Sequence, residues 1–300
     1  MKYAYYPGCS LSATGLEYNM SSQAVAPHLG IELQELPEWN CCGASSAHLQ
    51  DHTLALALPA RNLAIGEGLG LSLAIPCAAC LSRSKATEHA VRSSQETQSL
   101  IEALIDRPYT AAYPVKSLLE VFIESSLDIL QDKITTPLTG LKAAAYYGCL
   151  QARPTDYMDM DDPEKPQTID IIIEAVGADP VDWAHKTECC GNSHPTSYPK
   201  VGGPLVNRIL QQAETSGAEC IICACPMCFA NLDMRQKALG QERDRPFNLP
   251  IYYFTQLIGI ALGISPKTLG IDKHFVNATE LLVQKGFIPK AESSAKGGLA

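Results

Sequence analysis

One cysteine pattern occurs twice in the amino-acid sequence. Cys41-Cys42-Gly43 has a second copy, Cys189-Cys190-Gly191, 148 residues further along the chain. Each copy follows a single cysteine and precedes a pair, so the two stretches read C-x31-CC-x34-C-x2-C and C-x39-CC-x34-C-x2-C, with the same gap of 34 residues. A repeat of this length predicts that the 300 residues form two halves related by pseudo-symmetry.

The repeat divides the chain into three expected parts. We expect a first cysteine-rich half over residues 1–139, a second over residues 140–290, and a flexible tail over residues 291–300, which is rich in Ser, Ala, Lys and Gly. Ten of the twelve cysteines belong to the repeated pattern. The first set is Cys9, Cys41, Cys42, Cys77 and Cys80, and the second set is Cys149, Cys189, Cys190, Cys225 and Cys228.

Strand and helix signals alternate ahead of the cysteines in both halves. The predicted strands cover residues 2–6, 31–36 and 71–75, then 142–147, 180–183 and 220–223; the predicted helices cover 16–29 and 51–69, then 168–176 and 206–215. Residues 81–140 and 250–263 are expected to be mainly helical cover. Each half is therefore predicted as a Rossmann-like βαβαβ unit of an α/β protein, with its cysteines at the carboxyl ends of the strands.

The composition of the chain limits which partners it can bind and in which compartment it is expected. A net charge of -9 without a cluster of Lys or Arg argues against binding to nucleic acid or to an anionic lipid surface. No apolar run reaches the roughly 18 residues of a membrane-spanning helix, and the first residues lack the apolar core of a secretory signal. The sequence thus predicts a cytoplasmic protein, in which twelve cysteines suit metal or redox chemistry better than disulfide bonds.

The number of thiols in each half points to the kind of metal centre. A zinc site takes four ligands and a cubane iron–sulfur cluster takes four thiolates, whereas each half offers five cysteines. Two adjacent thiolates do not easily chelate one ion, but they can bind neighbouring irons, or one sulfur can bridge two. The sequence therefore favours an expanded or irregular iron–sulfur cluster in each half. The glycine after each pair lets the backbone approach that cluster closely.

The doubled motif closely resembles the cysteine-rich domain in the family of heterodisulfide reductase B subunits, from Cys9 to Leu262. The form found in sulfur-oxidising bacteria is one member that the chain is similar to. The resemblance implies that each set of five cysteines binds one non-cubane [4Fe-4S] cluster, and that a disulfide is cleaved or formed between the two clusters. It also implies a complex with a ferredoxin-like iron–sulfur subunit of the C type and a flavin subunit of the A type. The substrate is a disulfide or dithiol, free or bound to a carrier protein.

Two other functions remain open at this point. The same motif occurs in iron–sulfur subunits of quinone-linked dehydrogenases, which transfer electrons without catalysis of their own. That class commonly carries a ferredoxin segment, C-x2-C-x2-C-x3-C-P, which this sequence lacks. A zinc-binding scaffold without redox activity is the third hypothesis, and Cys220 and Cys223 would extend a four-cysteine clip with Cys225 and Cys228. The first half carries Ser72 and Ile75 at the aligned positions, which favours buried strand cysteines instead.

Several residues near the paired cysteines are weaker candidates. His48, His52 and His194 follow the pairs closely enough to act as proton donors to a leaving thiolate, although a surface position is the alternative for each. Trp39 and Trp183 precede the pairs and are expected to shield the clusters. The acidic run of Asp159, Asp161, Asp162 and Glu164 is expected to be a solvated loop.

Overall fold

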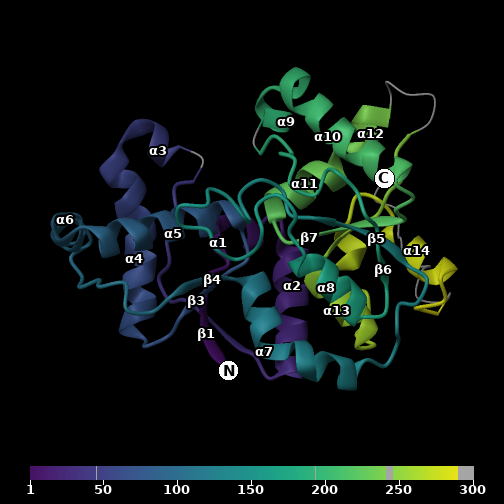
Figure 1. Cartoon of the computed structure of the whole chain (residues 1–300), viewed down its shortest axis with the longest axis horizontal. Helices are drawn as coiled ribbons and strands as arrows, with labels where there is room; N and C mark the ends of the chain where they lie inside the picture. The colour runs from purple at the N-terminus through teal and green to yellow at the C-terminus, as the bar shows by residue number, and fades with distance from the viewer. Residues whose placement is uncertain (45, 193, 241–245, 290–300) are drawn as a thin grey trace.

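The protein folds into two halves, each built on a parallel four-stranded sheet (Figure 1). The computed structural model describes residues 1–44, 46–192, 194–240 and 246–289. The first sheet has the order β2-β1-β3-β4 and the second the order β6-β5-β7-β8. The strands are β1 Lys2–Tyr5, β2 Glu32–Glu35, β3 Leu73–Ile75, β4 Val115–Ser117, β5 Lys142–Tyr146, β6 Asp179–Pro180, β7 Cys220–Cys223 and β8 Ile251–Tyr253.

The two sheets confirm the predicted α/β class and its pseudo-symmetry. β1 pairs in parallel with both β2 and β3, and β5 pairs in the same way with β6 and β7. The order within each sheet is therefore the same when the two halves are aligned. Because all neighbours are parallel, the carboxyl ends of the strands in each half meet at one edge, where α/β proteins build their sites.

Each sheet has one strand more than the predicted βαβαβ unit. Residues 115–117 and 251–253 were expected to lie in helical cover, but they form β4 and β8, which pair with β3 and β7. Each of these strands has only three residues and runs directly into an apolar helix. The predicted strand over residues 180–183 is also shorter, because only Asp179–Pro180 pairs with β5.

Helices surround both sheets. In the first half they are α1 Gly8–Leu11, α2 Leu16–Val25, α3 Ala47–Gln50, α4 His52–Gly68, α5 Ala78–Ser93, α6 Gln95–Ile105 and α7 Leu118–Lys133, with the 3-10 helix η1 Ala26–Leu29. In the second half they are α8 Thr168–Ala175, α9 His194–Ser197, α10 Pro199–Thr215, α11 Pro226–Met234, α12 Gln236–Gly240, α13 Phe254–Ala261 and α14 Ala278–Gln284, with the 3-10 helix η2 Ile271–Lys273.

The ends of these helices follow the signals in the sequence. Asp51 caps α4 by accepting a hydrogen bond from the Leu54 backbone N–H at 2.7 Å, as predicted. Gly30 ends the helical segment of residues 16–29 with a φ of 71°, a left-handed conformation that glycine adopts without steric cost. Ser117 and Glu120 form a capping box at the start of α7, which fixes the point where β4 turns into that helix.

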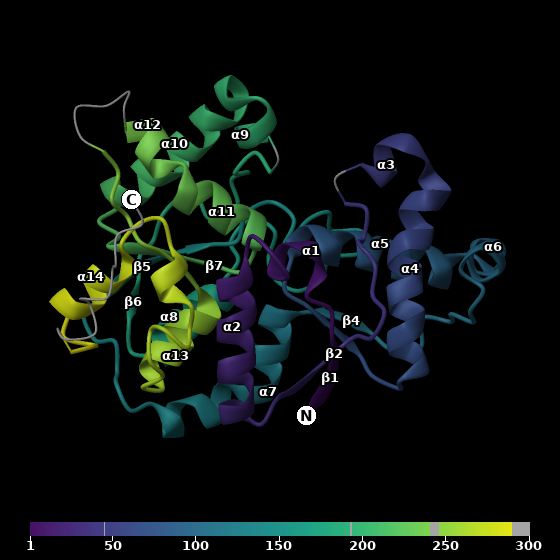
Figure 2. The same ribbon diagram turned by 180° about the vertical axis from the view of Figure 1, so that it is seen from behind.

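Four helices join the halves. Figures 1 and 2 both show α2 and α7 of the first half beside α8 and α13 of the second, and these helices contact one another. The Tyr18 ring stacks on the Tyr253 ring with centroids 4.0 Å apart, and the Phe122 ring meets the Phe254 ring edge-on at 5.3 Å. All four rings are buried, so the halves share one continuous core.

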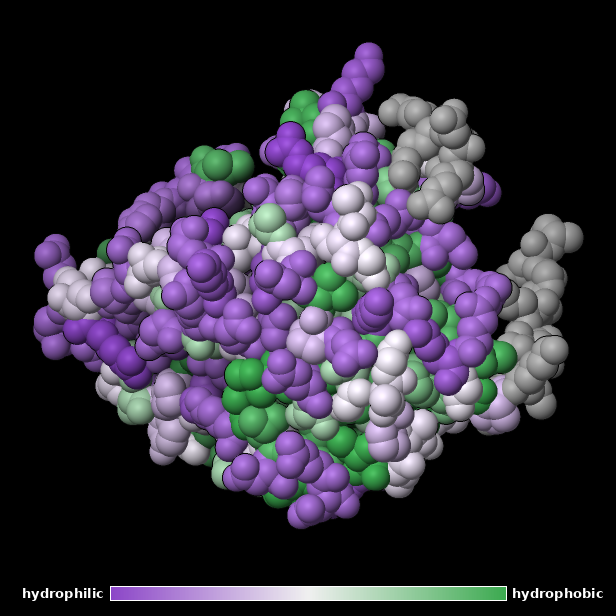
Figure 3. Space-filling view, turned by 45° about the vertical axis from the view of Figure 1, so that its right-hand side comes forward, coloured by the Kyte–Doolittle hydropathy of each residue, from purple (hydrophilic) through white to green (hydrophobic). Residues whose placement is uncertain are grey.

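The face of the molecule drawn in Figure 3 is mainly hydrophilic. Figure 3 shows hydrophobic residues gathered low in the view, at the height at which Figure 1 draws α7 and α13. Among the described residues, no helix combines the length and the apolar character that a membrane crossing requires.

Candidate metal centre

The cysteines lie where the strands of each half end. Cys9 belongs to α1 directly after β1, and Cys77 is the N-cap of α5 directly after β3. In the second half, Cys149 follows β5 and Cys225 is the N-cap of α11 after β7. The backbone N–H groups and the dipole at the start of a helix favour negative charge. The pKa of Cys225, at the start of α11, is indeed held well below its usual range, whereas the hydrogen bond shared with Cys225 raises the pKa of Cys77, at the start of α5.

A tyrosine anchors each cysteine pair to the first strand of its half. The Tyr6 hydroxyl donates a hydrogen bond to the Asn40 carbonyl oxygen at 2.8 Å, directly before Cys41. The Tyr146 hydroxyl donates to the Glu188 carbonyl oxygen at 2.7 Å, directly before Cys189. The two hydrogen bonds occupy equivalent positions in the repeat. Each half therefore holds its paired cysteines against the end of its central strand by the same contact.

Sulfur atoms within each half lie close together. Cys42 Sγ is 3.1 Å from Cys80 Sγ in the first half. In the second half, Cys190 Sγ is 3.6 Å from Cys228 Sγ, and Cys149 Sγ is 3.6 Å from Cys189 Sγ. The structure thus brings the paired cysteines next to the single cysteine or the C-x2-C pair, as the repeat requires.

The pKa of several thiols is lowered by these contacts. The hydrogen bond shared with Cys80 lowers the pKa of Cys42 to about 7. The hydrogen bond shared with Cys149 lowers the pKa of Cys189 to about 6. Within each pair one thiol holds its proton more tightly, and the pKa values of Cys80 and Cys149 are raised. Thiolate is the form that binds metal, so Cys42 and Cys189 are the members of these pairs that are closer to the binding form at neutral pH.

The two cysteine sets meet at the boundary between the halves. Hydrogen bonding with Cys228 and then with Cys77 holds the pKa of Cys225 well below its usual range, so Cys77 of the first half lies near Cys225 of the second. A cavity at the second set is lined by its cysteines together with Ala78 and Ala79, from the first turn of α5. The first half therefore forms one wall of the site of the second half.

Glycines let the backbone pass close to the sulfurs. Gly8 and Gly148 have φ values of 66° and 68°, in the left-handed region that favours glycine. A Cβ atom on Gly148 would lie 3.0 Å from Cys228 Sγ, and one on Gly8 would lie 3.4 Å from Cys80 Sγ. The glycine after each cysteine pair also brings its backbone close to a sulfur. The Gly43 N–H donates to Cys41 Sγ at 3.5 Å, and the Gly191 N–H donates to Cys189 Sγ at 3.3 Å.

Asn231 is a site residue that sequence reasoning missed. Its side-chain amide donates to Cys190 Sγ at 3.4 Å and to the Asn192 carbonyl oxygen at 2.7 Å, and only 4% of the residue is exposed. The first half has Arg83 at the equivalent position, six residues after Cys77. Because the repeat does not include this asparagine, the sequence offered no signal for it.

The three histidine candidates are exposed, whereas the two cysteines outside the repeat are buried. His48, His52 and His194 are all exposed. The pKa of Cys189 is lowered mainly by the hydrogen bond shared with Cys149. The charge of His194 lowers it further. Cys220 and Cys223 are fully buried on β7, as predicted; three positions apart on a strand, they face opposite sides of the sheet.

Trp183 and Trp39 pack beside the tyrosines that anchor the pairs. Trp183 lies against Tyr146 with ring centroids 6.3 Å apart, and Trp39 meets Tyr6 edge-on at 5.7 Å. Trp183 is 6% exposed and donates from its indole N–H to the Ala145 carbonyl oxygen at 2.9 Å. The tryptophans thus support the ends of β1 and β5.

The acidic run lies in a loop, and two of its carboxylates accept hydrogen bonds from backbone N–H groups. Asp161 Oδ2 accepts hydrogen bonds from the backbone N–H groups of Gln167 and Thr168, at 2.9 and 2.8 Å, at the start of α8. Asp162 accepts from the N–H groups of two residues that follow it. Asp161 thus stabilises the start of α8 and Asp162 a turn that precedes it, and both carboxylates lie in the loop that the sequence predicted.

The donor set fits an iron–sulfur cluster better than a single ion. Among the described residues, no three His, Cys, Asp or Glu side chains converge as ligands of one metal ion. Thiolates of a cluster are distributed over several irons, so they are not required to converge on one point. Sulfur donors with little competition from oxygen or nitrogen select iron–sulfur chemistry or zinc, and the zinc clip through Cys220 and Cys223 does not form.

Comparison with known proteins places this doubled site in a family. The model of the CCG cysteine-rich domain matches residues 3–83 and again residues 143–233. The chain belongs to the CCG cysteine-rich domain family. Each match covers one cysteine set and the first three strands of one sheet, so the domain is present twice. The resemblance to heterodisulfide reductase B subunits is confirmed by relatives of that name.

CCG relatives align along nearly the whole chain. The chain is 32% identical over 281 residues to the 8-methylmenaquinol:fumarate reductase membrane anchor subunit of Wolinella succinogenes, covering 93% of this chain and 99% of that one. It is 27% identical over 290 residues to the B subunit of the ferredoxin:CoB-CoM heterodisulfide reductase of Methanosarcina mazei, covering 94% and 96%. Both names describe subunits of reductases, which implies an oxidoreductase role for this CCG protein.

One solved structure shares the fold. A hypothetical protein from Helicobacter pylori superimposes with a TM-score of 0.72 at 14% sequence identity. The match covers 92% of this chain and 52% of that one. At this identity the likeness concerns the arrangement of helices and strands alone.

Proposed function

We propose that the chain is the catalytic iron–sulfur subunit of a heterodisulfide reductase-like complex, which reduces or forms a disulfide between two non-cubane [4Fe-4S] clusters. Each half would hold one cluster through its own five cysteines. The cavity at the second set carries the proposal, because Ala78 and Ala79, directly after Cys77 of the first set, line it together with the cysteines of the second set. We place the disulfide at this boundary, where it would lie between the two clusters.

The exposure of the cysteines supports access from solvent. Cys9 and Cys41 are exposed, and Cys149 and Cys189 are half-buried, whereas the C-x2-C cysteines of both halves are buried. All five cysteines of each half would hold its cluster, and the accessible ones would lie on the side from which a substrate approaches. Apolar surroundings such as Ala78, Ala79 and Met227 exclude water from the cavity at the second set.

Disulfide reduction has a simple balance. One disulfide takes up two electrons and two protons and gives two thiols, and dithiol oxidation is the reverse. Clusters exchange one electron at a time, so two clusters beside one another match the two electrons of the reaction. We assign His194, which is exposed and near Cys189, as the proton donor to a leaving thiolate.

Electrons must reach the chain from another protein. We propose a ferredoxin-like iron–sulfur subunit of the C type and a flavin subunit of the A type as partners, in the cytoplasm. The relatives named as subunits of larger reductases support a complex of this kind. The disulfide or dithiol itself is either a small molecule or a group carried by a protein.

A second function is electron transfer without catalysis, in a quinone-linked reductase. The 32% identity to a subunit of an 8-methylmenaquinol:fumarate reductase favours it. In that case the two clusters would pass electrons between subunits, and no disulfide would enter the boundary. The two functions predict different responses of the reduced protein.

The deciding experiment offers both kinds of oxidant to the full chain. The iron-loaded protein is reduced anaerobically, freed of reductant, and mixed with lipoamide, with the disulfide of mercaptoethanol, or with a water-soluble naphthoquinone. Disulfide chemistry predicts reoxidation of the clusters with release of two thiols for each disulfide consumed. Rapid reoxidation by the quinone while every disulfide is left intact would support electron transfer and contradict the catalytic proposal.

A further inference from the structure

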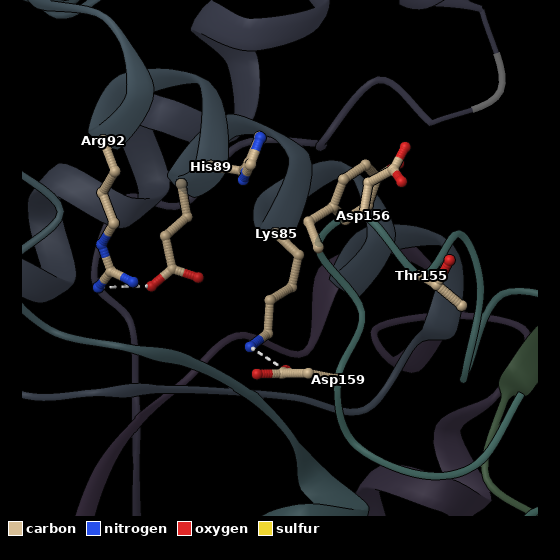
Figure 4. Close-up of a pocket in the computed structure, with 8 residues that line it drawn as sticks. Lys85, His89, Arg92, Thr155, Asp156 and Asp159 are labelled. Carbon is tan, nitrogen blue, oxygen red and sulfur yellow. Dashed lines mark ion pairs between the residues drawn. The ribbon is translucent and has the colours of Figure 1, made fainter.

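Two carboxylates that the fold removes from water are each paired with a cation. In the hollow lined by α5, the buried Glu88 is paired with Arg92 at 3.0 Å (Figure 4). In the second half, the buried Asp170 is paired with Lys186 at 2.7 Å. A charge without such a partner is costly to bury, so these ion pairs explain how the fold holds both carboxylates.

Glu17, in the first turn of α2, is buried without an ion pair. Only 6% of the residue is exposed, and none of the described lysines, arginines or histidines is paired with its carboxylate. The Tyr253 hydroxyl donates a hydrogen bond to Glu17 Oε1 at 3.4 Å. A Cβ atom on Gly270 would lie 2.8 Å from Glu17 Cβ, so the turn before η2 packs directly on this residue. Glu17 is therefore enclosed between the two halves.

Burial is the main influence on the charge of Glu17. It raises the pKa of the carboxyl group above its ordinary value of 4.5, against the hydrogen bonds from the residue's own backbone N–H and from Tyr253. Two charged groups of the second half face it: Asp233 of α11 raises the pKa further, and Lys273 of η2 lowers it. The carboxyl group thus binds a proton more tightly than a glutamate in water does.

Tyr253 links Glu17 to the helix that follows the second cysteine set. Its ring stacks on the Phe229 ring with centroids 4.3 Å apart, and Phe229 directly follows Cys228. The other face of the Tyr253 ring stacks on Tyr18, at 4.0 Å. The hydroxyl that binds Glu17 therefore belongs to a ring held rigidly against α11.

The Tyr253 hydroxyl also lies near the start of α11. A Cβ atom on Gly15, two residues before Glu17, would lie 3.6 Å from the Tyr253 hydroxyl oxygen and 3.1 Å from Pro226 Cβ. Pro226 directly follows Cys225. Only buried, closely packed groups separate the Glu17 carboxylate from Cys225. Charges interact more strongly through such a medium than through water.

The cost of burying Glu17 points to a role other than stability. A glutamine at this place would keep the contact with Tyr253 and would carry no charge. Because the pKa of Glu17 is raised in the folded chain, its ionised form lowers the free energy of unfolding. Ionisable groups that a fold holds at such a cost are typical of functional sites.

We propose that Glu17 takes up one proton from solvent when the second cluster takes up one electron, and releases the proton when the electron leaves. The negative charge added at the cysteines is then balanced by the charge removed at Glu17. Leu16, directly before Glu17, is exposed, so solvent lies a short distance away. Glu17 acts through its charge and touches neither cluster nor substrate. The inference rests on the proposed cluster of the second half, and it applies to disulfide chemistry and to electron transfer alike.

The reduction potential of the second cluster should depend on the pH. The iron-loaded full chain is titrated anaerobically and followed by EPR, from about pH 5.5 to about pH 8.5. Signals of the second cluster are identified by their change in Cys190→Ser. We expect the potential to fall by up to about 59 mV for each tenfold fall in proton concentration, the conversion for one proton per electron. In Glu17→Gln the potential should no longer depend on the pH.

Two further variants separate charge coupling from a structural effect. Tyr253→Phe removes a hydrogen bond that favours the ionised carboxylate, so the pH-dependent range should move to higher pH. Glu88→Gln makes the same change at the paired glutamate of α5 and should leave the pH dependence as in the native protein. A pH dependence that survives Glu17→Gln, or that Glu88→Gln abolishes equally, would overturn the proposal.

Stability shows whether Glu17 itself titrates. With a raised pKa in the folded chain, its stabilising contribution is fully present below pH 4.5 and is lost as the pH rises through the folded value. The denaturation midpoint of Glu17→Gln, relative to that of the native chain, should therefore increase with the pH. A difference that stays constant over the whole range would contradict the proposal.

Failure of this inference differs from failure of the proposed function. A chain that binds no iron contradicts both. A second cluster whose potential is independent of the pH contradicts the role of Glu17 and leaves the proposed function standing.

Discussion

Asn231 donates a hydrogen bond from its side-chain amide to Cys190 Sγ at 3.4 Å. Its buried position and its second bond, to the Asn192 carbonyl oxygen at 2.7 Å, fix the amide in this orientation. The first half has Arg83 at the aligned position. The two cysteine sets, equal in ligands, therefore differ in the polar groups that surround them.

Removal of Asn231 should lower the reduction potential of one cluster only. An N–H donor to a ligating sulfur stabilises the additional negative charge of the reduced state. We expect Asn231→Ala to lower that potential by tens of millivolts, and Asn231→Asp, which keeps the shape but adds negative charge, to lower it further. A redox titration followed by EPR measures the reduction potentials of both clusters. Asn207→Ala, at a half-buried asparagine, is the control. Unchanged potentials in both variants would contradict this role.

Loss of the anchoring hydroxyl should weaken one half at a time. Tyr146→Phe removes the hydrogen bond to the Glu188 carbonyl oxygen, and Tyr6→Phe removes the equivalent bond to Asn40. Each loss is expected to cost about 1 kcal/mol locally. We expect faster loss of iron from the second cluster in Tyr146→Phe and from the first in Tyr6→Phe, measured as chelator-induced bleaching. Equal bleaching of both clusters in each variant is the outcome that speaks against separate anchors.

A methyl group at Gly148 should exclude the second cluster. In Gly148→Ala the new Cβ would lie 3.0 Å from Cys228 Sγ, at a φ of 68° that alanine rarely adopts. Gly140→Ala is a matched control, because Gly140 has a φ of 79° but no atom within 4 Å of the place that a Cβ would take. Iron analysis should find about half the native content in Gly148→Ala and full content in Gly140→Ala. Full content in both would mean that the sulfur tolerates the methyl group.

Acid should destabilise the protein through His274. Burial lowers the pKa of this histidine to about 3, from 6.5. Its neutral ring lies edge-on to Phe229 at 4.8 Å and hydrogen-bonds with the Gln256 amide at 2.9 Å. Because the unfolded chain binds the proton more tightly, the stability is fully present above pH 6.5 and is lost as the pH falls towards 3.

The loss is expected to reach about 2 kcal/mol at about pH 5. Anaerobic denaturation midpoints measured between neutral and acid pH should show it. His274→Leu should flatten that dependence, while His28→Gln, at an exposed histidine, should not. A His274→Leu curve as steep as the native one would rule out this histidine as the cause.

The cysteine spacing predicted much of the architecture. Because parallel strands deliver their carboxyl ends to one edge, the positions of Cys9, Cys77, Cys149 and Cys225 could be assigned from the strands before them. Helix ends at Gly30 and Asp51 followed from local backbone chemistry. These features depend on a few neighbouring residues, which the sequence presents directly. The tail from residue 291 lies outside the described residues.

Features that depend on packing between distant segments could not be predicted. Cys77 and Cys225 come from different halves, so no local pattern encodes that they lie near one another. β4 and β8 have three residues each, too few for an alternating pattern to stand out from the apolar helices that follow. Asn231 acts alone, without a counterpart in the repeat.

The most direct test of two separate five-cysteine centres is anaerobic iron and acid-labile sulfide analysis combined with EPR. About eight irons and eight sulfides per chain are expected. Cys42→Ser should alter one set of EPR signals and Cys190→Ser the other, while Cys220→Ser, at a buried strand position, should leave both unchanged. A colourless protein with bound zinc and no sulfide, or the loss of both signals in either of the first two variants, would contradict the account.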